Sequence, residues 1–425
     1  MNNNNIRTES VRYYALAHLK NGVDRITANL KNLLIFCVAI AAIGFLSHHL
    51  VLSAPDYLYD IYNCTLTILF SIGIIIILII LGHVKGSLEC YKDFLRIGFC
   101  NHVREAPVLV KREECNGTER LTFHCRGITD SEWRERMDEI QSAMNKTIVR
   151  IRPGKTYRTV IVDVVPPSTA LGKLILWQDK FIDEDEAIFT LGHSLTGPVT
   201  IDIDKQPMLL IGGSTGSGKT MLCITFLLQA LKRNGRVYVF DFKGLDYQLL
   251  ASMDAHIVTS FDILRSELDA LVGQLHDRIA LFKEIGAFDF KDYQKIDSRS
   301  KFRRTFLLID ECAELLDPTG HIKEEKEVIY QITKNLNTIA RMGRAVGIHL
   351  IISTQRPDAN AVPGSIKSNL DVRICGKADA TLSTIILGDG RANEAIPKDS
   401  QGRFIMADGA EDIIFQGFFY DRSQL

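Results

Sequence analysis

LLIGGSTGSGKTM, residues 209–221, decides the fold of this chain. It places Gly213, Gly218, Lys219 and Thr220 at the spacing G-x-x-x-x-G-K-[ST]. With this spacing the glycines let consecutive backbone N–H groups turn toward phosphate oxygens, while the lysine reaches the terminal phosphates and the hydroxyl binds Mg²⁺. We therefore predict a phosphate-binding loop. Its nucleotide-binding residues are Gly213, Ser214, Thr215, Gly216, Ser217, Gly218, Lys219 and Thr220.

The segments on either side of this loop fit the prediction. PMLLIGG (207–213) is a short apolar run, as expected of a buried parallel strand. TMLCITFLLQALKR (220–233) has helical spacing and ends at Asn234–Gly235, a helix-stop signal. The start of that helix would add its partial positive charge to the phosphate site. A chance match in a Gly/Ser-rich turn would not have these neighbours.

Two further strands are predicted to end in polar residues. RRTFLLIDECAELL (303–316) leads into Asp310, a candidate Mg²⁺ ligand, and Glu311, a candidate base for the attacking water. This acidic pair indicates ATP hydrolysis rather than a nucleotide switch. GIHLIISTQRP (347–357) ends near Gln355, which could contact the γ-phosphate or the water. The alternative for Gln355 is a polar residue that simply ends a strand.

Composition narrows the remaining chemistry. The chain has 425 residues and a net charge of −1, so any DNA site must be a local patch. SRSKFRRT (298–305) is the densest basic cluster near the loop, although it could be only a solvated turn. Nine cysteines show no metal-like spacing. We interpret them as reduced thiols, including the loose cluster of Cys115, His124 and Cys125.

Two apolar segments precede the loop. LLIFCVAIAAIGFLSHHLVL (33–52) and LTILFSIGIIIILIILG (66–82) are long enough to span a bilayer, which requires about 17–25 residues. The alternative is a buried hairpin of a soluble core. Lys and Arg flank both segments, and the connecting SAPDYLYDIYN (53–63) has none. By the positive-inside rule we predict a multi-pass protein of the cell membrane with both termini cytoplasmic.

These observations divide the chain into four parts. Residues 1–32 form a cytoplasmic tail, 33–82 a two-helix transmembrane hairpin, 83–184 a linker with a small α/β module, and 185–425 a motor domain. IFTLGHSLTGPVTIDIDKQP (188–207) predicts a β-hairpin that leads into the loop strand.

Four stretches together resemble the motor of the FtsK/SpoIIIE family of DNA-pumping ATPases. They are PMLLIGGSTGSGKT (207–220), VYVFDFKGLDYQLLA (237–251), FLLIDECAELL (306–316) and RAVGIHLIISTQRPDANAVPGSIKSNLDVRICGKADATLSTIILG (344–388). The resemblance runs from about residue 185 to the end. It implies a RecA-like α/β motor, a homohexameric ring around DNA, and ATP with Mg²⁺ between subunits.

The resemblance also implies roles for individual residues. Glu311 would be the catalytic glutamate and Gln355 the polar sensor. An arginine from the neighbouring subunit would complete the site, and the family places it in a helix before the acidic strand. Arg278, in ELDALVGQLHDRIALFKEIGAF (267–288), matches that place, with Arg341 and Arg344 as alternatives.

The chain departs from the chromosome-segregating members, which carry more membrane spans, a long linker and a C-terminal sequence-reading domain. It is most similar to the short FtsK-like coupling proteins of conjugative transposons and plasmids of Gram-positive bacteria. Those proteins bring relaxase-bound DNA to the channel proteins of conjugation. A type VII-like protein-secretion ATPase, a chromosome-partitioning translocase without the reading domain, and a nucleotide-binding scaffold without turnover are the alternatives.

Overall fold

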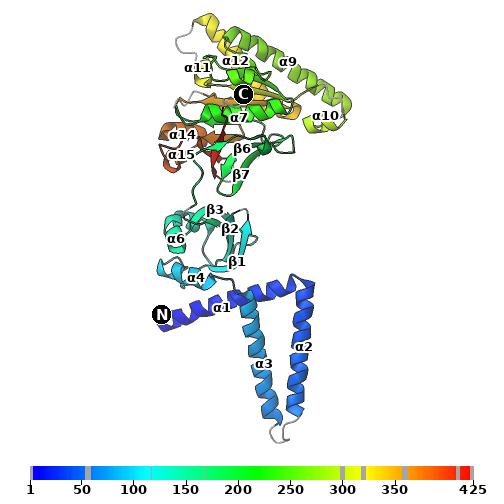
Figure 1. The fold of residues 1–425 in the computed structure, drawn as a ribbon, viewed down its shortest axis with the longest axis vertical. Coiled ribbons are helices and arrows are strands. Elements are labelled where there is room, and N and C mark those ends of the chain that lie inside the picture. Colours follow the sequence, from blue (N-terminus) through cyan, green and yellow to red (C-terminus); the bar gives the residue numbers. More distant parts are fainter. Residues whose placement is uncertain are drawn as a thin grey trace. The chain divides into compact units, whose positions relative to one another are not determined.

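The computed structural model describes residues 3–52, 59–115, 117–167, 169–296, 302–316, 322–356, 362–407 and 412–421. The chain forms two compact units, Met1–Ala170 and Leu171–Leu425 (Figure 1). The boundary falls before the predicted one at 184/185. The reason is that β5 (Ile175–Leu176) pairs with the last strand of the second unit, so this segment belongs to the motor.

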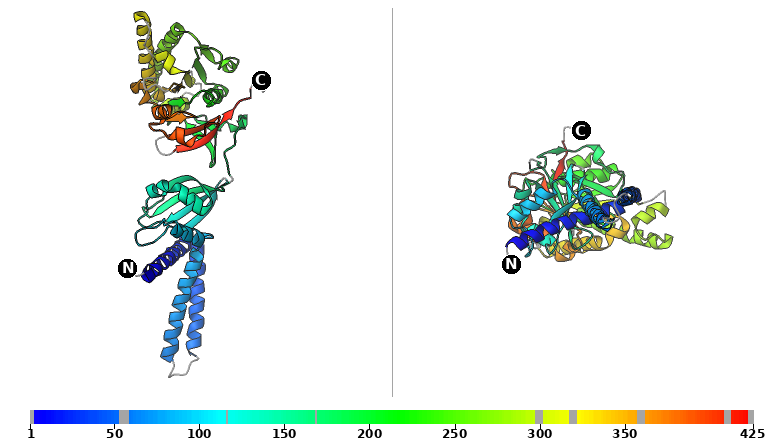
Figure 2. Two further views of the ribbon diagram at one scale, coloured as in Figure 1. Left: turned by 90° about the vertical axis from the view of Figure 1, so that its left-hand side faces the viewer. Right: turned by 90° about the horizontal axis from the view of Figure 1, so that it is seen from below.

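Helices dominate the first part of unit 1. They are α1 (Asn3–Thr27), α2 (Leu30–Leu52), α3 (Tyr59–Gly82) and α4 (Ser87–Arg96). Helices α2 and α3 run side by side as a hairpin, and α1 crosses their ends (Figures 1 and 2). Within the described residues, Asp60–Gly82 is long and apolar enough to span a membrane, and Leu33–Phe45 is a shorter apolar stretch.

Backbone contact fixes α1 against the end of α3. A Cβ on Gly22 would lie 2.0 Å from a carbonyl oxygen of α3, and Gly82 is equally close to α1, so only glycine allows this crossing. Asn21 Nδ2 donates to the carbonyl oxygen of Gly82 at 2.5 Å, and Arg25 Nη1 to that of Leu81 at 2.9 Å. These side chains satisfy carbonyl groups that the last turn of a helix leaves without partners.

The rest of unit 1 is the small α/β module that the sequence predicts. Its antiparallel sheet has the order β1-β2-β4-β3. Two short helices cover the sheet and bury Trp133 and Ile140 against Phe94 and Phe123. The module consists of β1 (Val108–Cys115), β2 (Thr118–His124), α5 (Asp130–Glu135), α6 (Met137–Met144), β3 (Thr147–Pro153) and β4 (Thr159–Val165).

Unit 2 is built on one sheet of eleven strands in the described ranges, with the order β10-β9-β11-β12-β8-β13-β14-β15-β6-β7 and β5 beside β15. Strands β10 to β13 along this order are parallel, and β14, β15, β6 and β7 are antiparallel. The predicted hairpin at 188–207 forms β6 and β7. The strands are β6 (Ile188–Ser194), β7 (Gly197–Asp202), β8 (Leu209–Gly212), β9 (Arg236–Phe240), β10 (His256–Val258), β11 (Thr305–Ile309), β12 (Ile348–Thr354), β13 (Val372–Cys375), β14 (Arg403–Ala407) and β15 (Asp412–Phe419).

Helices cover both faces of this sheet. Because side chains alternate along a strand, Leu210 packs into the cluster that includes α9, α12 and α14, whereas Leu209 and Ile211 pack toward α7. This is a mixed α/β fold, as predicted. The helices are α7 (Lys219–Lys232), α8 (Gln248–Ala251), α9 (Phe261–Ile285), α10 (Phe290–Ile296), α11 (Cys312–Leu316), α12 (Lys323–Met342), α13 (Gly364–Lys367), α14 (Ala380–Leu387) and α15 (Arg391–Ala395).

Candidate nucleotide site

The predicted phosphate loop joins the carboxyl end of β8 to the start of α7. Gly216 has φ +76° and Gly218 φ +95°, backbone conformations that side chains disfavour. A Cβ on Gly213 would lie 2.4 Å from the Ser217 hydroxyl. The loop is therefore a tight, glycine-dependent turn at the N-terminus of a helix of 14 residues, the geometry that binds phosphate.

The C-terminal strands support this loop from behind. The Gly402 N–H donates to the carbonyl oxygen of Ser217 at 2.8 Å, and the Gly417 N–H donates to that of Gly402 at 2.8 Å. A Cβ on Gly218 would meet the Gly402 backbone at 3.0 Å. The turn before β14 and the end of β15 thus hold the phosphate loop, although nearly 200 residues separate them in sequence.

Lys219 is buried at the first turn of α7, with 3% of its surface exposed. Its Nζ donates to Asp310 Oδ1 at 2.5 Å and to Ser353 Oγ at 3.0 Å, and Ser353 Oγ also donates to Asp310. Burial alone would lower the pKa of Lys219, but the adjacent Asp310 carboxylate more than compensates and raises it. The sheet therefore brings together the predicted loop lysine and the predicted acidic strand, and keeps the lysine charged.

Glu311 lies beside this pair in a backbone conformation with φ +52°, which is uncommon for a side chain with a Cβ. Its carboxylate accepts from the Thr354 hydroxyl at 3.1 Å and from the Gln355 N–H at 3.0 Å. Gln355 in turn accepts from the Thr215 hydroxyl through Oε1 at 2.9 Å. The candidate base, the candidate sensor and the phosphate loop therefore form one hydrogen-bonded set.

A cavity of about 510 Å³ opens over the loop. Lys243 and Asp246 line it, as do residues that the sequence analysis did not single out, because they follow distant strands and carry no motif. These additional lining residues include Lys173, Leu174, Gln401, Gln416, Phe418 and Phe419. Only the strand order, which places β15 near β8, brings them to the site.

The residues present fit a Mg²⁺ ion. Thr220 lines the cavity, and the Asp310 carboxylate lies at the strand end where Lys219 enters. Both supply oxygen ligands, and Mg²⁺ in nucleotide sites takes one or two protein oxygens plus phosphates rather than a complete protein cage. In keeping with this, the described residues contain no group of three or more His, Cys, Asp or Glu side chains able to hold a metal.

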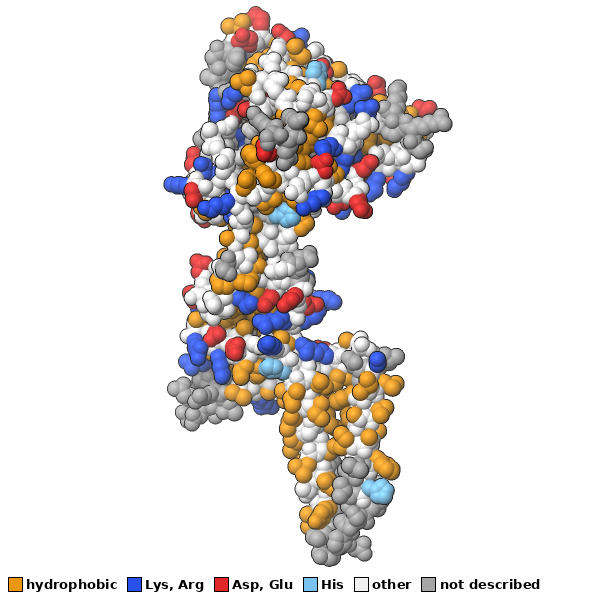
Figure 3. Space-filling view, in the orientation of Figure 1, with side chains coloured by type: hydrophobic (Ala, Val, Ile, Leu, Met, Phe, Trp, Pro, Cys, Tyr) orange, Lys and Arg blue, Asp and Glu red, His pale blue; other side chains and the backbone are white. Residues whose placement is uncertain are grey.

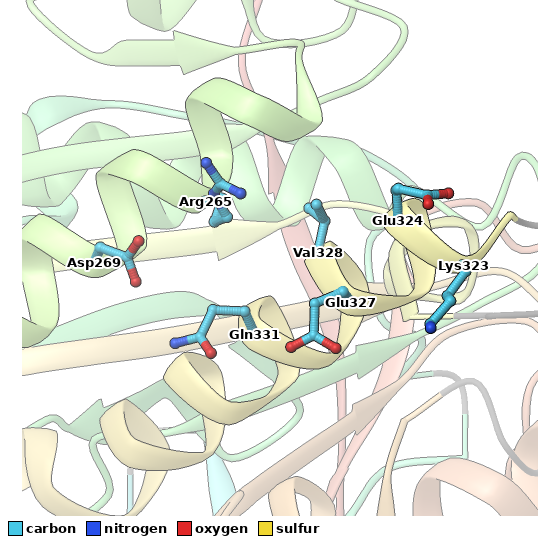
Figure 4. A pocket seen from close by; sticks show the side chains of 7 residues that line it. All are labelled: Arg265, Asp269, Lys323, Glu324, Glu327, Val328 and Gln331. Carbon is cyan, nitrogen blue, oxygen red and sulfur yellow. The ribbon is translucent and has the colours of Figure 1, made fainter.

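A second cavity, of about 560 Å³, lies between α9 and α12. Figure 4 shows Arg265 and Asp269 on α9 beside Glu327 and Gln331 on α12. Side chains of both signs line it, including Lys323 and Glu324 at the start of α12, but no glycine turn lies among its lining residues. Size alone therefore does not identify the nucleotide site.

The structure places Arg278, the arginine predicted to act across subunits, in the interior of its own subunit, where it is 1% exposed. Its guanidinium donates to the carbonyl oxygens of Val346 (2.8 Å) and Arg303 (2.9 Å) and to the Thr305 hydroxyl (3.0 Å). Burial lowers the pKa of Arg278 to about 10. Through these bonds Arg278 ties α9 to β11 within its own chain.

Comparison with known proteins identifies the unit that carries this site. The FtsK/SpoIIIE family model matches residues 175–359. The DNA translocase FtsK of Staphylococcus aureus (strain Mu50) is 30% identical over 239 residues, which cover 52% of this chain and 29% of that protein. That of Oceanobacillus iheyensis is 26% identical over 319 residues, covering 65% and 39%. The chain thus spans well under half the length of these curated relatives.

A solved structure matches much more completely. The monomer form of TcpA, the conjugation coupling protein of pCW3, solved with ATPγS, is 31% identical with a TM-score of 0.59. The match covers 80% of this chain and 97% of that one. With its phosphate loop, acidic strand and polar third strand brought together as described, the chain belongs to the FtsK/SpoIIIE family of P-loop ATPases.

Proposed function

We propose that this protein is a membrane-anchored, ATP-driven DNA translocase that acts as a coupling protein in conjugative DNA transfer. The observation that carries the proposal is the match to the pCW3 coupling protein over 97% of that protein's chain. The longer translocases of the family share only part of their length with this chain.

In the proposed reaction, ATP is hydrolysed in the cavity over the phosphate loop. Lys219 exchanges Asp310 for the β- and γ-phosphates and stabilises their charge. Glu311 orients the attacking water and takes its proton, with its carboxylate positioned by Thr354 and the Gln355 N–H. Thr220 and Asp310 would hold Mg²⁺, which would supply positive charge to the phosphates.

The proposed assembly is a homohexamer with ATP between subunits. Since Arg278 is buried, the arginine acting across the interface is then Arg341 or Arg344, both exposed. They line a surface cavity of about 540 Å³ together with Lys291 and Asp289. An exposed cation at the end of α12 can approach a neighbouring subunit without breaking internal bonds.

The proposed anchor is the α2–α3 hairpin, spanning the cell membrane twice with both termini cytoplasmic. Exposed side chains of α3 support this, among them Ile68, Ile72, Ile76 and Ile80, because such a surface is costly in water. Apolar side chains cover both helices (Figure 3). The residues of the connecting turn, 53–58, lie outside the described ranges.

DNA would contact the motor through phosphates, which position it without reading sequence. Of the basic candidates, Arg304 is nearly buried and pairs with Asp204 at 2.7 Å, which makes it structural. Residues 297–301 and 357–361 lie outside the described ranges. Lys367, which is half-buried, is a further candidate contact. A relaxase and channel proteins are the proposed partners.

The test is steady-state ATP hydrolysis by the full chain in lipid nanodiscs, with and without duplex or single-stranded DNA. We expect stimulation by DNA that declines as salt rises, because phosphate contacts release counterions. A chain with Lys219→Ala is the negative control for ATP hydrolysis. If neither form of DNA changed the rate of ATP hydrolysis, with or without a relaxase, the result would contradict the proposal and favour a protein-secretion ATPase.

A further inference from the structure

Two stripes of residues on helix α1 make contacts within unit 1. On the first, Tyr13 and Ala17 are buried in the core of the module, where the Tyr13 hydroxyl donates to the carbonyl oxygen of His124 at 3.2 Å. On the second, His18 and Gly22 contact the end of α3, and His18 Nδ1 lies 3.1 Å from the Gly82 carbonyl oxygen. Helix α1 is thus held on two sides within unit 1.

A third stripe of α1 is exposed. Arg12, Leu16, Lys20 and Val23 follow one another at spacings of four, four and three residues, which places them on one face of a helix. Leu16 is 52% exposed and Val23 is 42% exposed, and both cations are exposed as well. This face therefore combines apolar side chains with flanking long cations.

The position of α1 determines what this face meets. The helix crosses the end of α3 with its backbone in contact, so it cannot swing away from that end (Figures 1 and 2). If α3 spans the membrane, its cytoplasmic end lies at the bilayer surface, and α1 lies in the plane of the interface. The module and the α3 contact occupy its other stripes, which leaves the third stripe toward the lipid.

Charge indicates the kind of lipid. Helix α1 has four cations, Arg7, Arg12, Lys20 and Arg25, and two anions, Glu9 and Asp24, so it carries 4 − 2 = +2. Lys and Arg side chains gather at the level where the hairpin meets the module (Figure 3). A basic amphipathic helix of this kind binds anionic headgroups with its cations and buries its apolar side chains below them.

We propose that α1 is an interfacial helix that binds anionic phospholipids, with Leu16 and Val23 inserted below the headgroups and Arg12 and Lys20 at the phosphates. This inference rests on the proposed membrane anchor and adds a lipid-binding surface to it. The surface would couple the orientation of the module to the composition of the cytoplasmic leaflet.

The insertion is tested with tryptophan and brominated lipids, which quench tryptophan fluorescence at short range. The native Trp133 and Trp177 are buried in the module and the motor, at 0% and 2% exposure, and give a constant background. The variants L16W and V23W of the full chain are placed in vesicles of phosphatidylcholine and phosphatidylglycerol brominated near the headgroup. We expect both added tryptophans to be quenched.

Two controls separate the outcomes. F288W replaces a side chain of the motor that is 88% exposed and should stay unquenched. I76W, in the middle of α3, should be quenched by lipids brominated deep in the chains. Quenching at residue 76 without quenching at 16 and 23 would overturn the interfacial helix and leave the anchor intact, whereas no quenching at residue 76 would overturn the anchor itself.

The lipid preference is tested in the V23W chain by brominating either phosphatidylglycerol alone or phosphatidylcholine alone. We expect stronger quenching by brominated phosphatidylglycerol, and a local enrichment that falls about five-fold for each cation removed in R12Q and R12Q/K20Q. The matched control K283Q/K291Q removes two exposed charges from the motor and should change nothing. Equal quenching by the two lipids in all chains would overturn the assignment.

Discussion

Each unit of the molecule contains a buried carboxylate that is paired with cations. The two arrangements differ in how far these cations are exposed to water. In the module, Asp163 accepts from Arg120 at 2.9 Å and from Arg152 at 2.7 Å, and both arginines remain about one-third exposed. In the motor, Asp310 accepts from Lys219, whose side chain is 3% exposed. The module's cations keep contact with water, whereas the motor's cation has exchanged water for its partners.

The difference shows which pair can change partners. Asp163 joins neighbouring strands of the module's sheet, so its bonds tie β2 and β3 to β4. Asp310 faces the start of α7, where phosphates would compete for Lys219 from the cavity side. A desolvated lysine held by one carboxylate stays charged and pre-positioned, and an incoming anion can replace that carboxylate.

The largest expected effect is that of Lys219→Ala on ATP turnover. We expect ATP turnover to fall by about 10⁴-fold, within the range seen when a cation that stabilises transferring phosphoryl charge is lost. The matched variant Lys146→Ala removes a module lysine that pairs with Glu119 at 2.8 Å and should keep full turnover. Steady-state phosphate release measures the turnover of both variants. Similar losses of turnover in the two variants would contradict the proposed difference between the two ion pairs.

Glu311→Gln should lower turnover by about 10³-fold, the order expected when a general base is removed. ATP should still bind, because Glu311 contacts the strand end rather than the phosphate loop. Equilibrium binding of a fluorescent ATP analogue and single-turnover hydrolysis separate the two effects. Unchanged single-turnover rates would assign the base to another residue.

Arg278→Leu should destabilise the motor by about 3 kcal/mol, because it leaves buried carbonyl acceptors without a donor. ATP turnover per folded molecule of Arg278→Leu should stay within about two-fold. The matched variant Arg344→Ala changes an exposed arginine and should leave stability unchanged. Its ATP turnover tests whether Arg344 acts across subunits. Urea unfolding is read from Trp177 in a Trp133→Phe background. A stable Arg278→Leu protein without activity would restore the original prediction for Arg278.

Asp163→Asn should cost the module about 2 kcal/mol, less than for a fully buried pair because both arginines reach water. ATP turnover should be unaffected. Trp133 fluorescence, in a chain whose Trp177 is replaced by Phe, reports module unfolding in urea. Loss of turnover at full module stability would mean that this pair serves the motor.

The smallest effect is a pH dependence of the motor from His349, which is fully buried and stacked on Phe306. Burial lowers the pKa of His349 well below its usual value, so only the unfolded chain takes up a proton near pH 6.5. The motor should therefore lose about 0.7 kcal/mol of stability between pH 7 and pH 6. His349→Phe should remove this slope, and an unchanged slope would assign it to other groups.

Local patterns predicted the chemical parts of the site because each part is contiguous in sequence. The loop, its strand and helix, and the acidic strand each carry their signal within about fifteen residues. The walls of the cavity were not predictable in this way, since Lys173, Gln401 and Gln416 meet only through the order of the strands. Sheet order depends on pairings between distant segments, which one sequence does not reveal.

The burial of Arg278 could have been predicted from a local signal in its helix. The buried residues of α9 recur at spacings of four and three, and Arg278 occupies one of these positions. That stripe consists of Leu264, Leu268, Leu271, Leu275, Arg278 and Phe282. An arginine on the apolar stripe of a helix faces its own core, where its donors serve backbone acceptors, so periodicity outweighs the match to a family position.

The contact between the phosphate loop and the last strands has a consequence for how the chain can be shortened. Gly402 bonds the loop and Gly417 bonds Gly402, both through main-chain atoms, so no side-chain substitution elsewhere can replace them. A chain cut before Gly402 would keep every residue of the loop and lose both glycines behind it. In genetic terms, a truncation near the C-terminus would have the phenotype of a lesion in the ATP site.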